Sequence, residues 1–323
     1  MDLDVIFKTY ENEMRGVEKR LMDLFNSPAF PIPFIGKYIL EGGGKRLRPL
    51  VLILSTEIAN YKDDARLTFA SIIESIHTAS LLHDDVIDGA VIRRGKVPAH
   101  SIWGNQIVIL VGDFLYSNAL RLAVMHKSQR IMETLSEATT RMTEGEILQL
   151  SRTGDPEITE EEYIKIISAK TAVLISAACK IGAILGSLPQ DKEHALTQFG
   201  MKTGIAFQMV DDILDYKADE TELGKELGKD LKEGKITLPL IYLLKEANDD
   251  EKGEIKGIIK GNFKKRGLKR ILKLFDKYNC IEKSLDIARC LVDDAKNELL
   301  IFPSSYARDA LFTIADYTLK REK

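Results

Sequence analysis

Apolar residues recur along this chain at the three- and four-residue intervals of amphipathic helices. Near the N-terminus the pattern predicts a helix over residues 3–25, which a proline-rich segment at 27–33 ends. Further helical patterns cover residues 64–88, 105–124, 128–151 and a stretch that begins near Asp191. No segment alternates as a half-buried strand would. The pattern therefore predicts an all-α fold, and because no shift of composition marks a boundary we expect a single domain over residues 1–323.

Two acidic motifs lie inside these apolar helical patterns. Asp84 and Asp88 stand four residues apart in LLHDDVID, and Asp211 and Asp215 stand four apart in DDILD. Residues at this spacing share one face of a helix, and desolvated carboxylates repel each other unless a cation lies between them. Hard oxygen ligands without a cysteine or histidine cluster favour Mg²⁺ over zinc. The sequence therefore predicts Mg²⁺ sites that face a polyanion.

A glycine-rich loop, EGGGKRLRP, occupies residues 41–49. Glycines let a backbone approach a ligand closely, and Lys45, Arg46 and Arg48 follow them at once. The loop is therefore a candidate phosphate cradle, although it lacks the spacing of a P-loop. A helix-connecting loop with solvated charges is the alternative.

Other cations lie close to the acidic motifs along the chain. Arg93 and Arg94 come one short loop after Asp88. They could bind the same diphosphate as the metal ion held by Asp84 and Asp88. The alternative is that they form local salt bridges. The polar stretch at residues 216–239 predicts a mobile lid beside the anion site or a solvated connection. A lid would supply one of three lysines: Lys225, Lys229 or Lys235.

A helix-capping signal precedes the remaining cationic position. Thr159 and Glu162 have the spacing of a capping box, and the helix that they open carries Lys170 and Thr171. The small, apolar residues at 171–188 then predict a buried and closely packed helix. A lysine interrupts this segment, and no wholly uncharged run of membrane-spanning length occurs elsewhere.

The composition narrows the class of protein. Hydrophobic residues make up 45% and charged residues 29% of the 323 residues, which is ordinary for a globular protein. A net charge of −3 gives no general reason to expect a nucleic acid partner. The N-terminal MDLDVIF lacks the basic-then-apolar form of a secretory signal, and we expect a cytoplasmic protein. The basic run at 260–273 predicts a solvated helix face, with contact to anionic lipid as the alternative.

Carboxylate pairs and cations of this kind suit a reaction in which diphosphate leaves. Metal ions and cationic side chains would stabilise the charge that develops on the departing oxygens. The remaining carbon fragment must then be a stabilised cation, for which an allylic cation is the natural candidate. No Ser-His-Asp set or activated cysteine is evident, so covalent catalysis is not required.

Three other functions compete with this interpretation. His83 and Asp84 could form the HD pair of a metal-dependent phosphohydrolase, but His77, only six residues upstream, is a poor substitute for the distant histidines that such a site needs, and DDILD and the arginine pair would stay unexplained. A terpene cyclase would share the acidic motif but would not need a second cationic pocket. A helical scaffold or an inactive partner subunit would not need both acidic motifs, because idle buried carboxylates cost stability.

Five segments together resemble the trans-isoprenyl diphosphate synthase family. They are GGGKRLRP, LLHDDVID followed by RRG, the Lys170–Thr171 pair, FQMVDDILDY and EGKITLP, and they follow the family's order from residue 42 to residue 239. The segments EGEILQL, DPEITEEEY and DDILDYKAD are most similar to the bacterial members that make octaprenyl diphosphate. The resemblance covers nearly the whole chain.

This resemblance implies the all-helical isoprenoid synthase fold, with a single-domain bundle around a deep central cavity, and a homodimer. It implies Mg²⁺-dependent head-to-tail condensation of isopentenyl diphosphate with an allylic diphosphate such as farnesyl diphosphate. The product would serve as a quinone side chain, and its release allows a peripheral membrane contact. No nucleic acid partner is implied.

The resemblance also assigns roles by motif position. Asp84 and Asp88 match the first Mg²⁺ motif, and Asp211 and Asp215 match the second. The positions that bind isopentenyl diphosphate are Lys45, Arg48, His77 and Arg94. The positions around the allylic diphosphate are Arg93, Lys170, Thr171, Gln208, Lys225 and Lys235. Three of these would also turn oxygen dipoles toward the carbocation as catalytic residues: Lys170, Thr171 and Gln208.

Two small residues precede the first acidic motif, where short-chain family members tend to carry aromatic residues. They are Ala79 and Ser80, and each helical turn below Asp84 would deepen the cavity by about 5.4 Å, close to one isoprene unit. An open floor predicts a long product, of octaprenyl length by the resemblance. The alternatives are that both residues serve only close packing, that the product is shorter (farnesyl or geranylgeranyl), or that the chain is a non-catalytic partner subunit.

Overall fold

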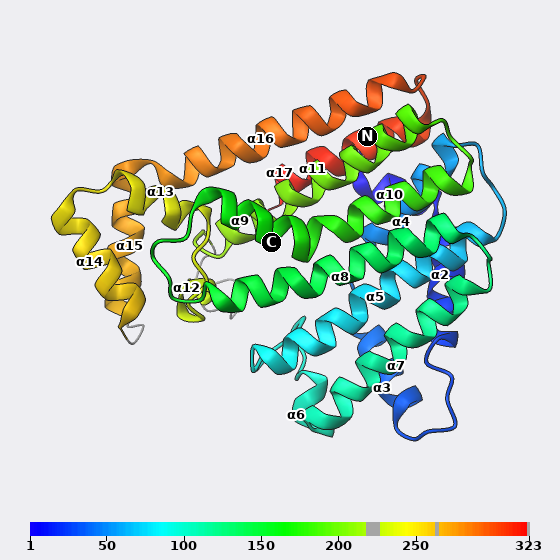
Figure 1. Ribbon diagram of the computed structural model, residues 1–323, viewed down its shortest axis with the longest axis horizontal. Helices are drawn as coiled ribbons and strands as arrows, with labels where there is room; N and C mark the ends of the chain where they lie inside the picture. The colour runs from blue at the N-terminus through cyan, green and yellow to red at the C-terminus, as the bar shows by residue number, and fades with distance from the viewer. Residues whose placement is uncertain (218–226, 262–264, 322–323) are drawn as a thin grey trace. The chain divides into compact units, whose positions relative to one another are not determined.

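The computed structural model describes residues 1–217, 227–261 and 265–321 (Figure 1). All the regular elements in these ranges are helices, and the single β feature among them is an isolated bridge between Arg93 and Lys96. The predicted all-α fold is therefore confirmed.

Contacts between Cα atoms divide the chain into two compact units, each built from three segments. The first unit comprises Met1–Thr139, Ala177–Thr197 and Ile301–Thr313. The second comprises Thr140–Ser176, Gln198–Leu300 and Ile314–Lys323. The expectation of a single domain stays a prediction.

The first unit is organised around one long helix, which packs against α2, α4 and α7. Its helices are α1 (Leu3–Thr9), α2 (Glu11–Asp23), α3 (Ile32–Glu41), α4 (Leu47–Ile58), α5 (Ala65–Ile87), α6 (Ala99–Trp103) and α7 (Asn105–Val124). The central helix is α5, as the pattern at 64–88 predicted. Its apolar face enters a buried cluster with Leu82 from α5 and Val108, Val111 and Leu115 from α7.

The predicted continuous helix over residues 3–25 is wrong in one respect. The chain forms two helices, α1 and α2, because Tyr10 leaves the helical conformation with φ −100° and ψ 20°. The Tyr10 hydroxyl donates a hydrogen bond of 2.6 Å to Glu57 Oε2 of α4. This tertiary contact is invisible to a periodicity that continues on both sides of Tyr10.

The second unit contains helices of its own and parts of helices that it shares with the first unit. Its own elements are α9 (Glu160–Ile167), a π-helical turn η1 (Ser168–Ala172), α12 (Lys229–Lys232), α13 (Leu238–Glu246), α14 (Asp249–Lys260), α15 (Lys265–Tyr278) and α16 (Cys280–Glu298). Thr159 caps α9 through a complete capping box with Glu162, as predicted. Four α-helices in the described ranges contribute residues to both units: α8 (Gln129–Ser151), α10 (Val173–Leu185), α11 (Gln190–Leu214) and α17 (Tyr306–Lys320). The short 3-10 helix η2 (Leu299–Ile301) also does so.

The small-residue segment forms a closely packed helix, as predicted. Within the first unit, a Cβ atom added at Gly182 of α10 would lie 2.5 Å from the Ser55 Cβ atom of α4, so only glycine permits this approach. By length and composition alone, two stretches in the described ranges could cross a membrane, Asn105–Val124 and Glu160–Leu185. The second is 72% buried, which is typical of a core helix, and the first is 33% buried. Core helices of soluble proteins pass the same test, so this evidence is weak.

Candidate active site

In the first unit, the first acidic motif occupies the last turn of α5. Asp84 and Asp88 are half-buried, and Asp88 is the C-cap residue of the helix. Between them, Asp85 is buried and accepts the guanidinium of Arg93 at 2.6 Å. The local salt bridge that the sequence left open for Arg93 is therefore present, and it places a cation next to the predicted metal ligands.

The glycine-rich loop contains residues with positive φ angles, and two arginines, Arg46 and Arg94, lie beside or within it. Gly43 has φ +70°, and Arg46, the N-cap residue of α4, has φ +49° in the left-handed region. The Arg94 guanidinium donates to the Gly43 carbonyl oxygen. Arg46 itself turns inward and forms a buried ion pair of 2.7 Å with Glu74 of α5. Arg46, one of the three cations of the candidate phosphate cradle, therefore has a buried carboxylate partner within the protein.

His77 of α5 lies among these arginines. Its Nε2 atom is 3.2 Å from Arg48 Nη1. Burial lowers the pKa of His77 well below its usual value, and the nearby positive charges of Arg48 and Arg94 lower it further. A neutral imidazole adds a hydrogen-bonding group to this arginine cluster without adding to its positive charge. The structure thus brings together three residues predicted to bind isopentenyl diphosphate, His77, Arg48 and Arg94, while the fourth, Lys45, is exposed.

In the second unit, Lys170 and Thr171 lie in the π-helical turn η1 rather than in a regular α-helix. Such turns interrupt α-helices and occur frequently at functional sites. Two glycines let neighbouring helices approach the turn: a Cβ atom at Gly145 of α8 would lie 2.8 Å from the Lys170 nitrogen, and one at Gly204 of α11 would lie 2.6 Å from Ala172 Cα. The backbone that presents both predicted ligands is therefore held on two sides.

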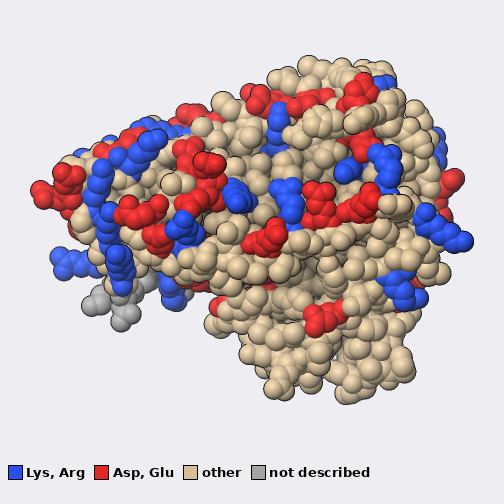
Figure 2. All heavy atoms as spheres, viewed as in Figure 1, with Lys and Arg blue, Asp and Glu red and all other residues tan. Residues whose placement is uncertain are grey.

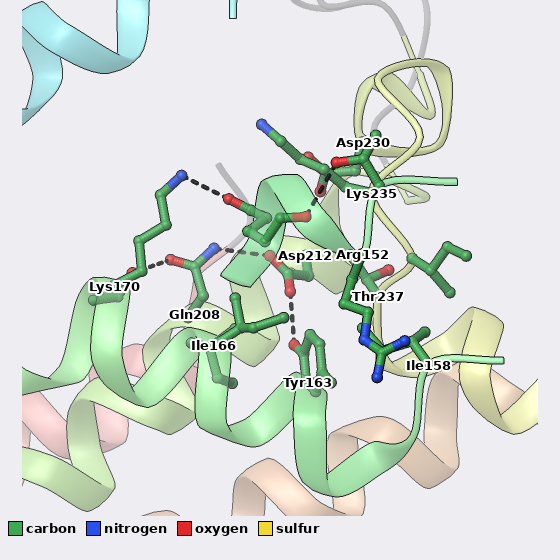
Figure 3. Close-up of a pocket in the computed structure, with 15 residues that line it drawn as sticks. Arg152, Ile158, Tyr163, Ile166, Lys170, Gln208, Asp212, Asp230, Lys235 and Thr237 are labelled. Atoms are coloured by element: carbon green, nitrogen blue, oxygen red, sulfur yellow. Dashed lines mark hydrogen bonds between the residues drawn. The ribbon is translucent and has the colours of Figure 1, made fainter. Parts of the chain in front are cut away.

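Lys170 is held by two side chains of α8. Its Nζ atom forms an ion pair of 2.5 Å with Glu146 and donates to Gln149 Oε1 at 2.7 Å. Both partners belong to the EGEILQL segment, whose spacing of three residues places them on one helix face. The ammonium group points into a pocket of the second unit, which Thr171, Gln208 and Asp212 also line (Figure 3).

A chain of hydrogen bonds runs through this pocket (Figure 3). Thr171 Oγ1 donates to Gln208 Oε1 at 2.9 Å, and Gln208 Nε2 donates to Asp212 Oδ1 at 2.8 Å. The other oxygen of Asp212 lies 2.6 Å from the buried hydroxyl of Tyr163 on α9. Burial raises the pKa of Asp212 to about 7, although the hydrogen bonds from Tyr163 and Gln208 oppose the rise.

The two aspartates of the second acidic motif have different surroundings. Asp215 accepts the backbone amides of Lys229 and Asp230 at 3.1 and 3.0 Å, so it anchors the start of α12. Asp211 is half-exposed and forms an ion pair of 3.1 Å with Arg321. Burial, together with repulsion from Asp212 and Asp215, raises the pKa of Asp230 well above its usual value. Several carboxylates in one small volume favour a bound cation.

The chemistry of these donors fits Mg²⁺. Within residues 1–217, 227–261 and 265–321, no three His, Cys, Asp or Glu side chains are arranged to hold a metal by themselves. Mg²⁺ usually binds through one or two carboxylates together with water and substrate phosphates, rather than in an all-protein cage. Carboxylate pairs therefore suit a metal that arrives with a diphosphate.

The structure describes two of the three lysines that were predicted to belong to a lid, Lys229 and Lys235. Lys235 lines the pocket and forms an ion pair of 2.7 Å with Glu233. Lys229 begins α12 and lies 3.4 Å from Glu233. Lys225 lies outside the described residues. The lid hypothesis therefore stays a prediction.

The two residues that were predicted to set product length, Ala79 and Ser80, have different surroundings. Ala79 is 2% exposed and belongs to the buried cluster between α5 and α7. Ser80 is half-buried, and its hydroxyl donates to the His77 carbonyl oxygen at 2.9 Å. Close packing, the alternative interpretation, therefore describes the surroundings of Ala79, and Ser80 is the better position at which to test chain length.

Sequence reasoning missed two residues of the second unit. Tyr163 received no role from the sequence patterns, and its hydrogen bond to the buried Asp212 carboxyl is what identifies it. Arg321 stacks on the Phe207 ring, with 4.1 Å from guanidinium carbon to ring centroid, while it pairs with Asp211. Its Nε and Nη1 atoms are buried without an acceptor among the described residues. No spacing rule links Arg321 to Asp211, which lies 110 positions earlier.

The first unit has an arginine cluster, and the pocket of the second unit is lined by two carboxylates and three cationic side chains. Such sites on an all-helical fold suit the class of helical enzymes that act on phosphate-bearing substrates. The family model for polyprenyl synthetase matches residues 33–275 of the chain. Octaprenyl diphosphate synthase from Escherichia coli (strain K12) is 37% identical over 323 residues, which is 100% of both chains.

Solved structures of polyprenyl synthases also resemble this chain over nearly its whole length. A decaprenyl diphosphate synthase from Rhodobacter capsulatus has a TM-score of 0.95 at 35% identity and covers 99% of each chain. A polyprenyl synthase from Caulobacter crescentus CB15, solved with calcium and isoprenyl diphosphate, has a TM-score of 0.94 at 37% identity over 100% of this chain and 98% of that chain. The chain therefore belongs to the polyprenyl synthetase family and has the all-α isoprenoid synthase fold. The resemblance seen in the sequence is confirmed.

Proposed function

We propose that this prenyltransferase condenses isopentenyl diphosphate head-to-tail with an allylic diphosphate such as farnesyl diphosphate, in a Mg²⁺-dependent reaction. Relatives matched over nearly their full length are named octaprenyl and decaprenyl diphosphate synthases, which supports a long all-trans polyprenyl product. The name of the Escherichia coli protein supports octaprenyl length. The product would become the side chain of a quinone.

One observation carries this proposal: Lys170, Thr171 and Gln208 converge on a single pocket beside the second acidic motif. The Lys170 ammonium supplies positive charge for a leaving diphosphate. Thr171 and Gln208 supply oxygen dipoles that stabilise an allylic cation. A phosphohydrolase would need the ammonium but not the uncharged dipoles.

The first unit supplies the features of a second anion site. Arg48 and Arg94 would bind the diphosphate of isopentenyl diphosphate, because guanidinium groups form paired hydrogen bonds to phosphate oxygens. Neutral His77 adds a hydrogen-bonding group without another charge, and Lys45 stands exposed beside the glycine-rich loop. Arg93, already paired with Asp85, would contact the allylic diphosphate.

The predicted ligands of Mg²⁺ are Asp84, Asp88, Asp211 and Asp215. Bound Mg²⁺ would supply Lewis-acid stabilisation of the charge on the departing diphosphate oxygens. The raised pKa of Asp215, caused first by burial, supports a cation next to the second motif. The Caulobacter relative was solved with calcium and isoprenyl diphosphate, which supports a divalent metal.

We also propose a cytoplasmic homodimer that contacts a membrane peripherally when it releases product. Figure 2 shows few charged side chains over α6 and α7. Large apolar side chains are exposed there, namely Ile102, Ile109, Leu110, Val124 and Met125. A second copy of the chain would bury these side chains, which analytical ultracentrifugation can test.

The reaction can be tested with labelled isopentenyl diphosphate, farnesyl diphosphate and MgCl₂, followed by sizing of the extracted prenyl alcohols. We expect a narrow distribution that ends near octaprenyl length and disappears with EDTA. A stop at farnesyl or geranylgeranyl length would indicate the shorter-chain alternative. Binding of diphosphate without elongation would indicate a non-catalytic partner subunit.

A matched pair of substitutions refines this test. Asp211→Asn should lower the rate by about 100-fold or more, because it removes a charge that would hold the metal. Asp276→Asn changes an exposed aspartate of α15 and should leave the rate unchanged. Equal rates in the two variants would refute the assignment of Asp211.

A further inference from the structure

Tyr163 ends the hydrogen-bond chain that begins at Thr171. Both Tyr163 and its partner Asp212 are almost fully buried, with 3% and 6% of their surface exposed. The Tyr163 hydroxyl and Asp212 Oδ2 are 2.6 Å apart, which is short for a hydrogen bond between two oxygens. Tyr163 belongs to α9 and Asp212 to α11, so the contact joins two helices of the second unit.

The chemistry of these groups sets the direction of every hydrogen bond between Asp212 and Thr171. Gln208 Nε2 can only donate, so it must face the Asp212 carboxyl oxygen at 2.8 Å. The Gln208 amide oxygen then faces Thr171, whose hydroxyl has to donate its hydrogen at 2.9 Å. The hydroxyl oxygen of Thr171 is left with its lone pairs for the pocket.

Without Tyr163, the orientation of the carboxyl group would depend on Gln208 alone. The Tyr163 hydroxyl lies 2.6 Å from Oδ2, and Gln208 Nε2 lies 2.8 Å from Oδ1, so each carboxyl oxygen has its own side-chain donor. A phenol hydroxyl on a buried ring has little freedom to move, so it fixes the position of Oδ2.

We propose that Tyr163 is a positioning residue for the condensation. By holding Asp212 it orients the Gln208 amide, and through that amide it directs the lone pairs of Thr171 toward the allylic cation. This inference rests on the proposed function, because an oxygen dipole of fixed direction matters only where positive charge develops. Tyr163 itself does not touch the substrate in this scheme.

Tyr163→Phe keeps the buried ring and removes only the hydroxyl. We expect kcat to fall about tenfold, with KM for both diphosphates changed less than about twofold, because the dipole acts on the developing charge and not on the diphosphates. A loss confined to KM, or an unchanged kcat in a variant that melts as the parent does, would overturn the proposal.

Tyr242→Phe is a matched control. The Tyr242 hydroxyl also donates to a carboxylate on α9, Glu160 at 2.9 Å, but it lies outside the hydrogen-bond chain. This variant loses the same kind of contact on the same helix, so kcat should stay within about twofold of the parent value. If both variants lose kcat equally, Tyr163 only stabilises α9 and the proposal fails.

A double-mutant cycle tests the route through Thr171. Thr171→Val removes the last hydroxyl, and adding Tyr163→Phe to it should then cost no more than about twofold. Losses that multiply would show that Tyr163 acts independently of Thr171. Thr171→Ser keeps a hydroxyl and should retain most of kcat, which tests the far end of the chain even if Tyr163→Phe fails to fold.

The activity of the parent enzyme distinguishes a failure of this inference from a failure of the proposed function. A parent that makes no prenyl product refutes the proposed function itself. A parent that elongates normally, together with a Tyr163→Phe variant of equal kcat, refutes only the role of Tyr163.

Discussion

Gly145 of α8 stands against the π-helical turn that carries Lys170 and Thr171. A Cβ atom at this position would lie 2.8 Å from the Lys170 nitrogen and 2.9 Å from the Ala169 Cβ atom. Neither neighbour is the flexible end of a long side chain. Gly145→Ala therefore forces the helix and the turn apart, and it tests whether their close approach matters for the pocket.

The magnitude follows from two opposed effects. Alanine in place of glycine inside a helix stabilises a protein by up to about 1 kcal/mol. Overpacking a close contact destabilises it by about 1–3 kcal/mol, and a contact of 2.8 Å must open to an ordinary 3.4 Å or more. The clash should win, for a net destabilisation of about 0–2 kcal/mol. Displacing the turn by this distance should lower kcat about tenfold or more, because misplaced catalytic groups lose rate steeply.

Gly253→Ala is the matched control, because a Cβ atom at Gly253 of α14 would have no neighbour within 4 Å. The two variants share the same gain in helix propensity, so their difference in unfolding free energy isolates the clash. Urea unfolding should place Gly145→Ala about 1–3 kcal/mol below Gly253→Ala. If the two are equally stable and the condensation rate of Gly145→Ala equals that of the parent, the reasoning is refuted.

Three further predictions concern the first unit. Glu74→Gln removes the buried counter-ion of Arg46 and should lower the unfolding free energy, measured in urea, by about 3–5 kcal/mol. Glu11→Gln changes an exposed ion pair and should alter the unfolding free energy little. Similar losses in the two variants would contradict the role of the buried pair. The pKa of His77 is lowered on folding from 6.5, so the unfolded chain binds a proton that the folded chain does not. Stability should therefore fall as the pH drops below about 6.5, and His77→Gln should reduce this loss when urea unfolding at pH 8 is compared with pH 5.5. Ser80→Phe should shorten the prenyl alcohols made from farnesyl diphosphate, and an unchanged distribution would remove Ser80 from the determinants of length.

Local rules were sufficient to predict much of this protein from its sequence. Helical spacing placed Asp84 and Asp88 on the last turns of one helix, and the capping box predicted where α9 begins. These signals depend on residues three or four positions apart, whose relation a helix sets by itself. The order of the motifs then identified the family, which the full-length relatives confirm.

Tertiary structure alone decided which partner each polar group meets. Asp85, which lies between two predicted metal ligands, forms an ion pair with Arg93. Asp211 forms an ion pair with Arg321, which lies near the C-terminus of the chain. The π-helical turn at Lys170 and the hydrogen bond from Tyr163 to Asp212 likewise depend on packing between helices. Periodicity reports which face of a helix is apolar but not which side chain of another helix lies opposite. The sequence therefore determined the fold class and the family, whereas long-range packing decided how the predicted site residues are oriented.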